Sequence, residues 1–137
     1  MAENIDIVRD LYSAFQRGDI DTVMAGMSPD IDWRSVGDPE HWPGFGERQG
    51  REAARGYFDV LAEELDFRDF QVHEIDACGD KVIAEGVSKV AFKQGGLPVD
   101  AEWAHIYTLK DGKIVRFREF MDTAQVRQIR MQSFAMA

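Results

Sequence analysis

The stretch from Asp100 to Thr123, which reads DAEWAHIYTLKDGKIVRFREFMDT, constrains the fold more than any other part of the chain. Two runs rich in apolar residues flank Lys110-Asp111-Gly112. A short turn that contains glycine between two such runs predicts a β-hairpin, because glycine readily adopts the positive φ that tight turns need. We therefore expect a fold built on a sheet that includes these two strands.

The length of this turn decides which side chains share a face with His105. A two-residue loop, Asp111-Gly112, places His105 opposite Arg118, whereas a three-residue loop ending in Gly112 places it opposite Phe117. We expect the three-residue loop, because it separates apolar from charged side chains better. The inward face then consists of Trp103, His105, Tyr107, Val115, Phe117, Glu119 and Met121. One histidine and one carboxylate thus share an apolar, aromatic face, where pKa values shift.

The overall composition excludes several classes of partner. The chain has 137 residues, with 16 basic and 25 acidic side chains and a net charge of −9. Such a charge argues against binding to nucleic acid or to an anionic membrane surface, because both reward clustered Lys and Arg. No apolar run is long enough to span a bilayer, no signal peptide is visible, and the single cysteine excludes an internal disulfide. We expect one cytoplasmic domain that spans residues 1–137.

The first half of the chain has the periodicity of helices. Apolar residues recur at helical spacing over residues 5–15, and Gly18 ends this pattern. Asp19 is placed to cap a second, short helix. The following segments are predicted as a strand, a loop rich in Gly and Pro, and a third helix, over residues 30–36, 37–50 and 50–64.

The second half of the chain is predicted to form strands. Residues 69–76 and 81–92 flank Cys78-Gly79-Asp80, which is a second hairpin signal. The hairpin around Gly112 completes the sheet, and Thr123 is placed to cap a final short helix. This order predicts an α+β fold in which helices pack against one curved antiparallel sheet.

Three stretches of the sequence resemble the SnoaL-like polyketide cyclases, a branch of the nuclear transport factor 2-like (ketosteroid isomerase-like) superfamily. They read IVRDLYSAFQRGDID, GREAARGYFDVLAEEL and EWAHIYTLKDGKIVRFREFMDTA. The resemblance implies a cone-shaped, cystatin-like architecture, in which a bent sheet wraps around N-terminal helices and encloses a hydrophobic pocket. It also implies a homodimer formed across the outer face of the sheet. Because the superfamily includes cyclases, isomerases, epoxide hydrolases and dehydratases as well as binding proteins, the fold alone leaves the activity open.

Three residues are candidates for catalysis. The resemblance implies an acid–base role for Asp122, at the end of the last strand, and an oxyanion-stabilising role for His105. Glu119 is a candidate because the predicted register places its side chain in the pocket, on the strand next to that of His105. Each has a structural alternative: Asp122 as a helix cap, and His105 with Glu119 as a hydrogen-bonded pair inside the core. Aromatic and apolar side chains would line the pocket, namely Tyr12, Trp33, Trp42, Tyr57, Trp103, Tyr107, Phe117 and Met121.

Several residues that mark other reactions of the superfamily are missing. Ser35 stands where the ketosteroid isomerases carry their basic aspartate, and Gly86 and Ser88 stand near two members of the epoxide hydrolase triad. His41 and His73 lack the spacing of metal ligands, and no nucleotide-binding motif is present. We therefore expect neither a metal nor another cofactor.

The leading hypothesis is acid–base catalysis without a cofactor on a small lipophilic carbonyl compound. The reaction would be a cyclisation, an isomerisation or a dehydration, in which Asp122 or Glu119 moves a proton and His105 stabilises the oxyanion. The alternative is a binding or sensing module that holds a small hydrophobic ligand without turnover.

Overall fold

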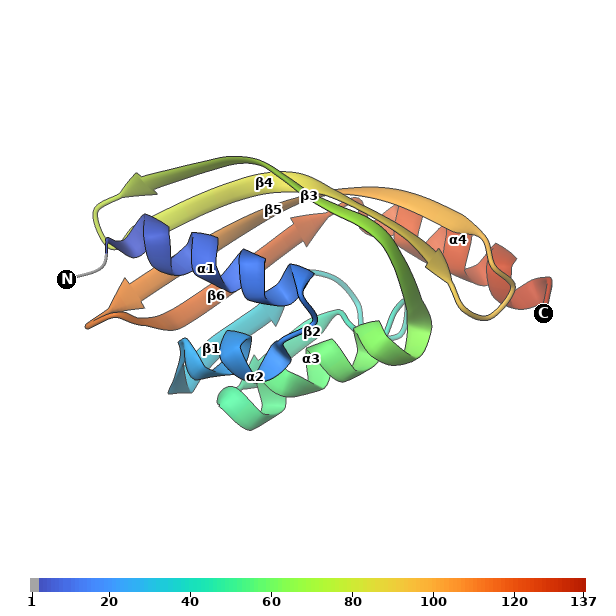
Figure 1. Ribbon diagram of the computed structural model, residues 1–137. Helices are drawn as coiled ribbons and strands as arrows, with labels where there is room; N and C mark the ends of the chain where they lie inside the picture. Colours follow the sequence, from blue (N-terminus) through green and yellow to red (C-terminus); the bar gives the residue numbers. More distant parts are fainter. Residues whose placement is uncertain (1–2) are drawn as a thin grey trace.

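A computed structural model describes residues 3–137 (Figure 1), and within them the chain forms four helices and six strands. The helices are α1 (Asn4–Gln16), α2 (Ile20–Ala25), α3 (Arg51–Glu64) and α4 (Thr123–Ala135). The strands are β1 (Met27–Ser35), β2 (Gly46–Gln49), β3 (Leu65–Cys78), β4 (Lys81–Phe92), β5 (Pro98–Lys110) and β6 (Lys113–Met121). The predicted α+β class is confirmed. Among the described residues, no helix has both the length and the apolarity needed to cross a membrane.

The strands form one curved, open sheet in the order β2-β1-β6-β5-β4-β3. Neighbouring strands are antiparallel except for β1 and β6, which run parallel. The prediction of an antiparallel sheet therefore holds for every pair but this one. The segment 37–50 was predicted as a loop throughout, but its end forms β2, a short edge strand paired with β1.

The hairpin of β5 and β6 is confirmed, but its turn is shorter than predicted. Lys110 pairs with Lys113, so the loop contains only Asp111 and Gly112, both at positive φ. A bulge then leaves Val115 without a partner, because Leu109 pairs with Ile114 and Thr108 with Arg116. The extra residue restores the predicted inward face beyond it, while Ile114 takes the buried position that was predicted for Val115.

Three other elements are longer than predicted. β1 begins at Met27 rather than at residue 30, so Met27 belongs to this strand and not to the second helix. β3 begins at Leu65 rather than at residue 69, and register shifts interrupt its pairing with β4. α4 has 13 residues, and its N-cap is Asp122 rather than Thr123. As a result, the last helix continues to Ala135 and packs beside β5 at the end of the sheet.

The core lies between the concave face of the sheet and the N-terminal helices. Figure 1 shows α1 and α3 beneath the arch formed by β3 and β4. α1 buries Val8, Tyr12 and Ala14, and α3 buries Ala54, Tyr57 and Leu61. These helix faces meet buried residues of β1, β5 and β6, so aromatic side chains from five elements converge on one region.

Candidate functional site

A cavity with two lobes lies where these aromatic side chains converge. The first lobe, which we call the histidine lobe, includes Tyr12, Trp33, His105, Tyr107 and Phe117 in its wall. The second, the tryptophan lobe, includes Trp42, Trp103, Met121 and Val126. Each lobe has a volume of about 50 Å³. The two lobes adjoin, because both are lined by Tyr57, Leu61, Phe67, Ser88 and Glu119.

Glu119 on β6 is the central polar group of the site, and three side chains donate hydrogen bonds to it. One carboxylate oxygen, Oε1, accepts from the hydroxyl of Tyr57 at 2.7 Å and from that of Ser35 at 2.8 Å. The other, Oε2, lies 2.9 Å from Nε2 of His105. Because Glu119 and His105 are each only 6% exposed, solvent contributes little to these bonds.

The surroundings of Glu119 keep its carboxyl group ionised. Burial alone raises the pKa of Glu119, but the hydrogen bond and charge of His105 and the hydrogen bonds from Tyr57 and Ser35 act in the opposite direction. Their combined effect lowers the pKa below its usual range. The carboxyl group of Glu119 is therefore ionised at neutral pH.

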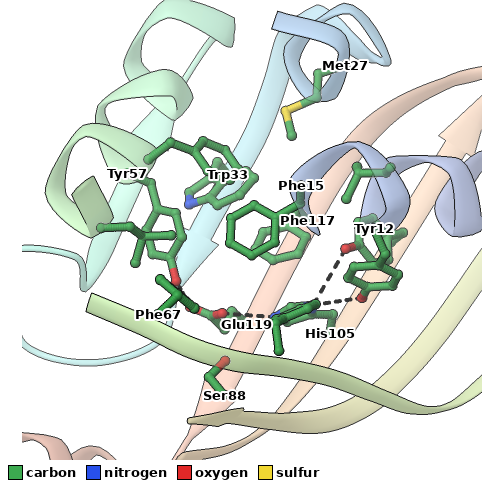
Figure 2. Close-up of a pocket in the computed structure, with 15 residues that line it drawn as sticks. Tyr12, Phe15, Met27, Trp33, Tyr57, Phe67, Ser88, His105, Phe117 and Glu119 are labelled. Carbon is green, nitrogen blue, oxygen red and sulfur yellow. Dashed lines mark hydrogen bonds and ion pairs between the residues drawn. The ribbon is translucent and has the colours of Figure 1, made fainter. Parts of the chain in front are cut away.

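The ionised carboxylate determines how His105 is protonated. A carboxylate can only accept hydrogen bonds, so Nε2 of His105 carries a hydrogen and donates it to Glu119. The other ring nitrogen, Nδ1, lies 2.8 Å from the hydroxyl of Tyr12 and 3.5 Å from that of Tyr107. Figure 2 shows His105 between Glu119 on one side and Tyr12 on the other. In neutral His105, Nδ1 is thus an acceptor directed at the tyrosine hydroxyls.

Aromatic stacking fixes the plane of the imidazole ring. The ring centroids of Trp103 and His105 lie 4.1 Å apart, and the angle between the two ring planes is 18°. Tyr12 stacks on the ring at 5.9 Å, and Phe117 approaches it at 5.0 Å. His105 is therefore held both by its hydrogen bonds and by its neighbours.

The tyrosines of the site remain protonated. Burial raises the pKa of Tyr12, Tyr57 and Tyr107 above the ordinary tyrosine value, and the charge of Glu119 raises each further. All three hydroxyls therefore remain able to donate hydrogen bonds at physiological pH.

The structure brings most of the predicted site residues together. His105 and Glu119 form a direct pair, and every predicted lining residue lies in the wall of one lobe or the other. Asp122 does not line either lobe. Its side chain accepts a hydrogen bond from the backbone N–H of Gln125 at 3.1 Å, which is the geometry of a helix N-cap.

The sequence analysis missed the parts played by two serines. Ser35 is fully buried and donates to Glu119, although the sequence marked it only as the site of a missing aspartate. Ser35 follows Trp33 by two residues on the same strand. Because alternate residues of a strand share a face, this spacing could have predicted that Ser35 lies on the same face as Trp33. Ser88, in turn, lines both lobes of the cavity.

Solved structures with the same fold identify the class of protein. A nuclear transport factor 2-like protein from Burkholderia thailandensis E264 is 31% identical, with a TM-score of 0.85, over 95% of this chain and 98% of that chain. One from Burkholderia pseudomallei K96243 is 22% identical, with a TM-score of 0.85, over 94% and 98%. TerC, crystallised with polyporic acid, is 24% identical, with a TM-score of 0.82, over 92% and 96%. The fold is nuclear transport factor 2-like.

The family follows from the sequence. The model of the SnoaL-like domain matches residues 8–117. The chain therefore belongs to the SnoaL-like family. No curated protein sequence matches it.

Proposed function

We propose that the protein catalyses proton transfer, without a cofactor, on a small lipophilic carbonyl compound. The observation that carries this proposal is the buried Glu119–His105 pair in an aromatic cavity, with Nδ1 of His105 directed at the hydroxyls of Tyr12 and Tyr107. Glu119 holds the imidazole in the tautomer whose Nδ1 is unprotonated, so Nδ1 can take a proton from a substrate that displaces the hydroxyl of Tyr12. His105 is therefore the base in this proposal, in place of the Asp122 or Glu119 expected from the sequence.

The tyrosine hydroxyls supply the other half of the chemistry. Removal of a proton next to a carbonyl group places negative charge on its oxygen, and preorganised donors stabilise that charge. Tyr12 and Tyr107 present two protonated hydroxyls close to Nδ1. Enolisation by this arrangement is the common first step of an isomerisation, a dehydration or an aldol-type cyclisation.

One observation favours a second candidate function, a ligand-binding module without turnover. Glu119 has three donors and Nδ1 of His105 already has Tyr12 as a partner, so the network is satisfied without a substrate. A closed network of this kind stabilises a fold whether or not it moves protons.

Deuterium exchange distinguishes the two functions. Small enolisable ketones and β-diketones are incubated with the protein in D₂O, and the incorporation of deuterium is followed by NMR. We expect exchange with the wild type and with Asp122→Asn, and loss of exchange in His105→Ala and Glu119→Gln, each variant first shown to be folded. Compounds that raise the melting temperature without exchanging would favour the binding module.

We also propose that a second copy of the chain covers the outer face of the sheet. Ile83 on β4 and Phe120 on β6 are exposed there, and Ile106 on β5 pairs with Ile83. Apolar side chains on neighbouring strands of one open face suit a contact between two protomers. Sedimentation at equilibrium tests this proposal, with a monomeric mass as the contrary result.

A further inference from the structure

The cavity is too small for an organic ligand as it stands. Each lobe has a volume of about 50 Å³, so even together the lobes are smaller than the engineered cavity of about 150 Å³ that holds one benzene molecule. A carbonyl compound with even a single ring therefore cannot reach His105 unless part of the wall moves.

The wall that separates the cavity from the surface contains one exposed side chain. An open groove of about 640 Å³ lies outside the cavity, between α1, α3 and the start of β3. Two residues, Leu61 and Phe67, line this groove and both lobes. Leu61 is only 7% exposed, whereas Phe67 is 38% exposed. Displacing Phe67 thus opens both lobes to the groove while the rest of the core stays packed.

The backbone of β3 is irregular beside Phe67. Phe67 pairs with Val90 and Asp69 pairs with Lys89, so Arg68 is an extra residue in β3. Such a bulge interrupts the ladder and bends the strand. The ring of Phe67 meets that of Phe15 edge to face at 5.6 Å, and Phe15 lines the groove as well. The ring of Phe67 thus stands between the groove and the lobes, beside an irregular segment of β3.

We propose that Phe67 is the residue that determines ligand size at this site. Its ring is a movable wall: in the closed position it separates the two lobes from the groove, and in the open position it admits the ligand between α1 and α3. The proposal builds on the proposed function, because it assumes that the ligand binds beside His105. The ligands that fit are compact ones of a single ring, and a smaller side chain at position 67 would admit two fused rings.

Tryptophan fluorescence tests the movable wall without any ligand. The chain has three tryptophans, and all three line the lobes: Trp33, Trp42 and Trp103. Acrylamide, a small neutral quencher, should reach them slowly in the wild type. We expect its quenching constant to rise at least twofold in Phe67→Ala and by less in Phe67→Leu. Met131→Ala, which truncates an exposed side chain (61%) that lines neither lobe, is the control and should leave quenching unchanged.

Two ketones test the size limit directly by calorimetry. Acetophenone has one ring and 2-acetylnaphthalene has two, and we expect Phe67→Ala to shift the ratio of their affinities at least tenfold toward the larger ketone. Equal quenching in folded Phe67→Ala and wild type, or an unchanged ratio of affinities, would overturn the proposal. Because quenching requires no turnover, a protein that fails to exchange deuterium can still pass or fail this test.

Discussion

Replacement of Glu119 by glutamine is expected to reverse the tautomer of His105 while the fold is kept. The amide oxygen of glutamine can still accept from Tyr57 and Ser35, but its NH₂ group then faces Nε2 of His105. Nε2 must accept from this group, so the ring hydrogen moves to Nδ1 and points at Tyr12. The variant thereby removes the base from the cavity without emptying the site.

The cost in stability follows from the hydrogen bonds of Glu119. A bond to a charged group contributes about 1.5–3 kcal/mol and a neutral one about 0.5–1.5 kcal/mol, so each of the three bonds weakens by about 1 kcal/mol. Because the variant no longer buries a charge, part of this loss is offset, and we expect a net cost of about 2 kcal/mol. For a chain of this length, that lowers the melting temperature by roughly 6 °C.

Nitrogen-15 NMR of the histidine side chains measures the tautomer. In the wild type, Nδ1 of His105 should have the shift of an unprotonated nitrogen, and in Glu119→Gln that of a protonated one. Deuterium exchange should fall by about 10⁴-fold, as when the acid behind a catalytic histidine is replaced by its amide. Ser35→Ala is the matched control, because it removes a donor from the same carboxylate without changing the tautomer. A folded Glu119→Gln protein whose Nδ1 stays unprotonated would refute the reasoning.

Two further predictions concern pH and the helix cap. The pKa of Glu119 is lowered in the folded state, so its contribution to stability is complete above the ordinary value of about 4.5 and is lost as the pH falls through the folded-state pKa. Urea unfolding from pH 6 to 3 should show a shallower decline for Glu119→Gln than for the wild type, and parallel declines would contradict this. Asp122→Ala should cost about 1 kcal/mol in urea unfolding because the cap of α4 is lost, whereas Asp122→Asn keeps the cap. Loss of deuterium exchange in Asp122→Asn would instead identify Asp122 as the base.

The sequence was sufficient to predict the parts of the fold that depend on local signals. Gly112 between two apolar runs indicated the hairpin, and its alternation placed His105 and Glu119 on one face. This placement survived an error in the loop length, because the observed two-residue turn with a bulge differs from the predicted turn by an even number of positions. Only a register shift by an odd number of residues would turn the inward side chains of the strand outward.

Features that depend on distant segments were not predictable in the same way. The parallel pairing of β1 with β6 joins residues more than 80 positions apart, and a Trp33–Phe117 contact leaves no mark in either local sequence. Asp122 was ambiguous for another reason: a carboxylate between a strand and a helix suits both a pocket rim and an N-cap, and only the position of the helix decides between them. The bulge at Arg68 likewise has no local signature.

The bulge at Val115 makes the chemistry of this site depend on an odd or even count of residues. Deleting Val115 would remove the bulge and leave a regular hairpin in which Tyr107 still pairs with Phe117 and His105 with Glu119. If the unaltered chain paired without the bulge, Arg116 and Arg118 would point into the cavity, and Phe117 and Glu119 would point to solvent. One unpaired residue in β6 therefore decides whether the cavity contains Glu119 beside His105 or two arginines in its place.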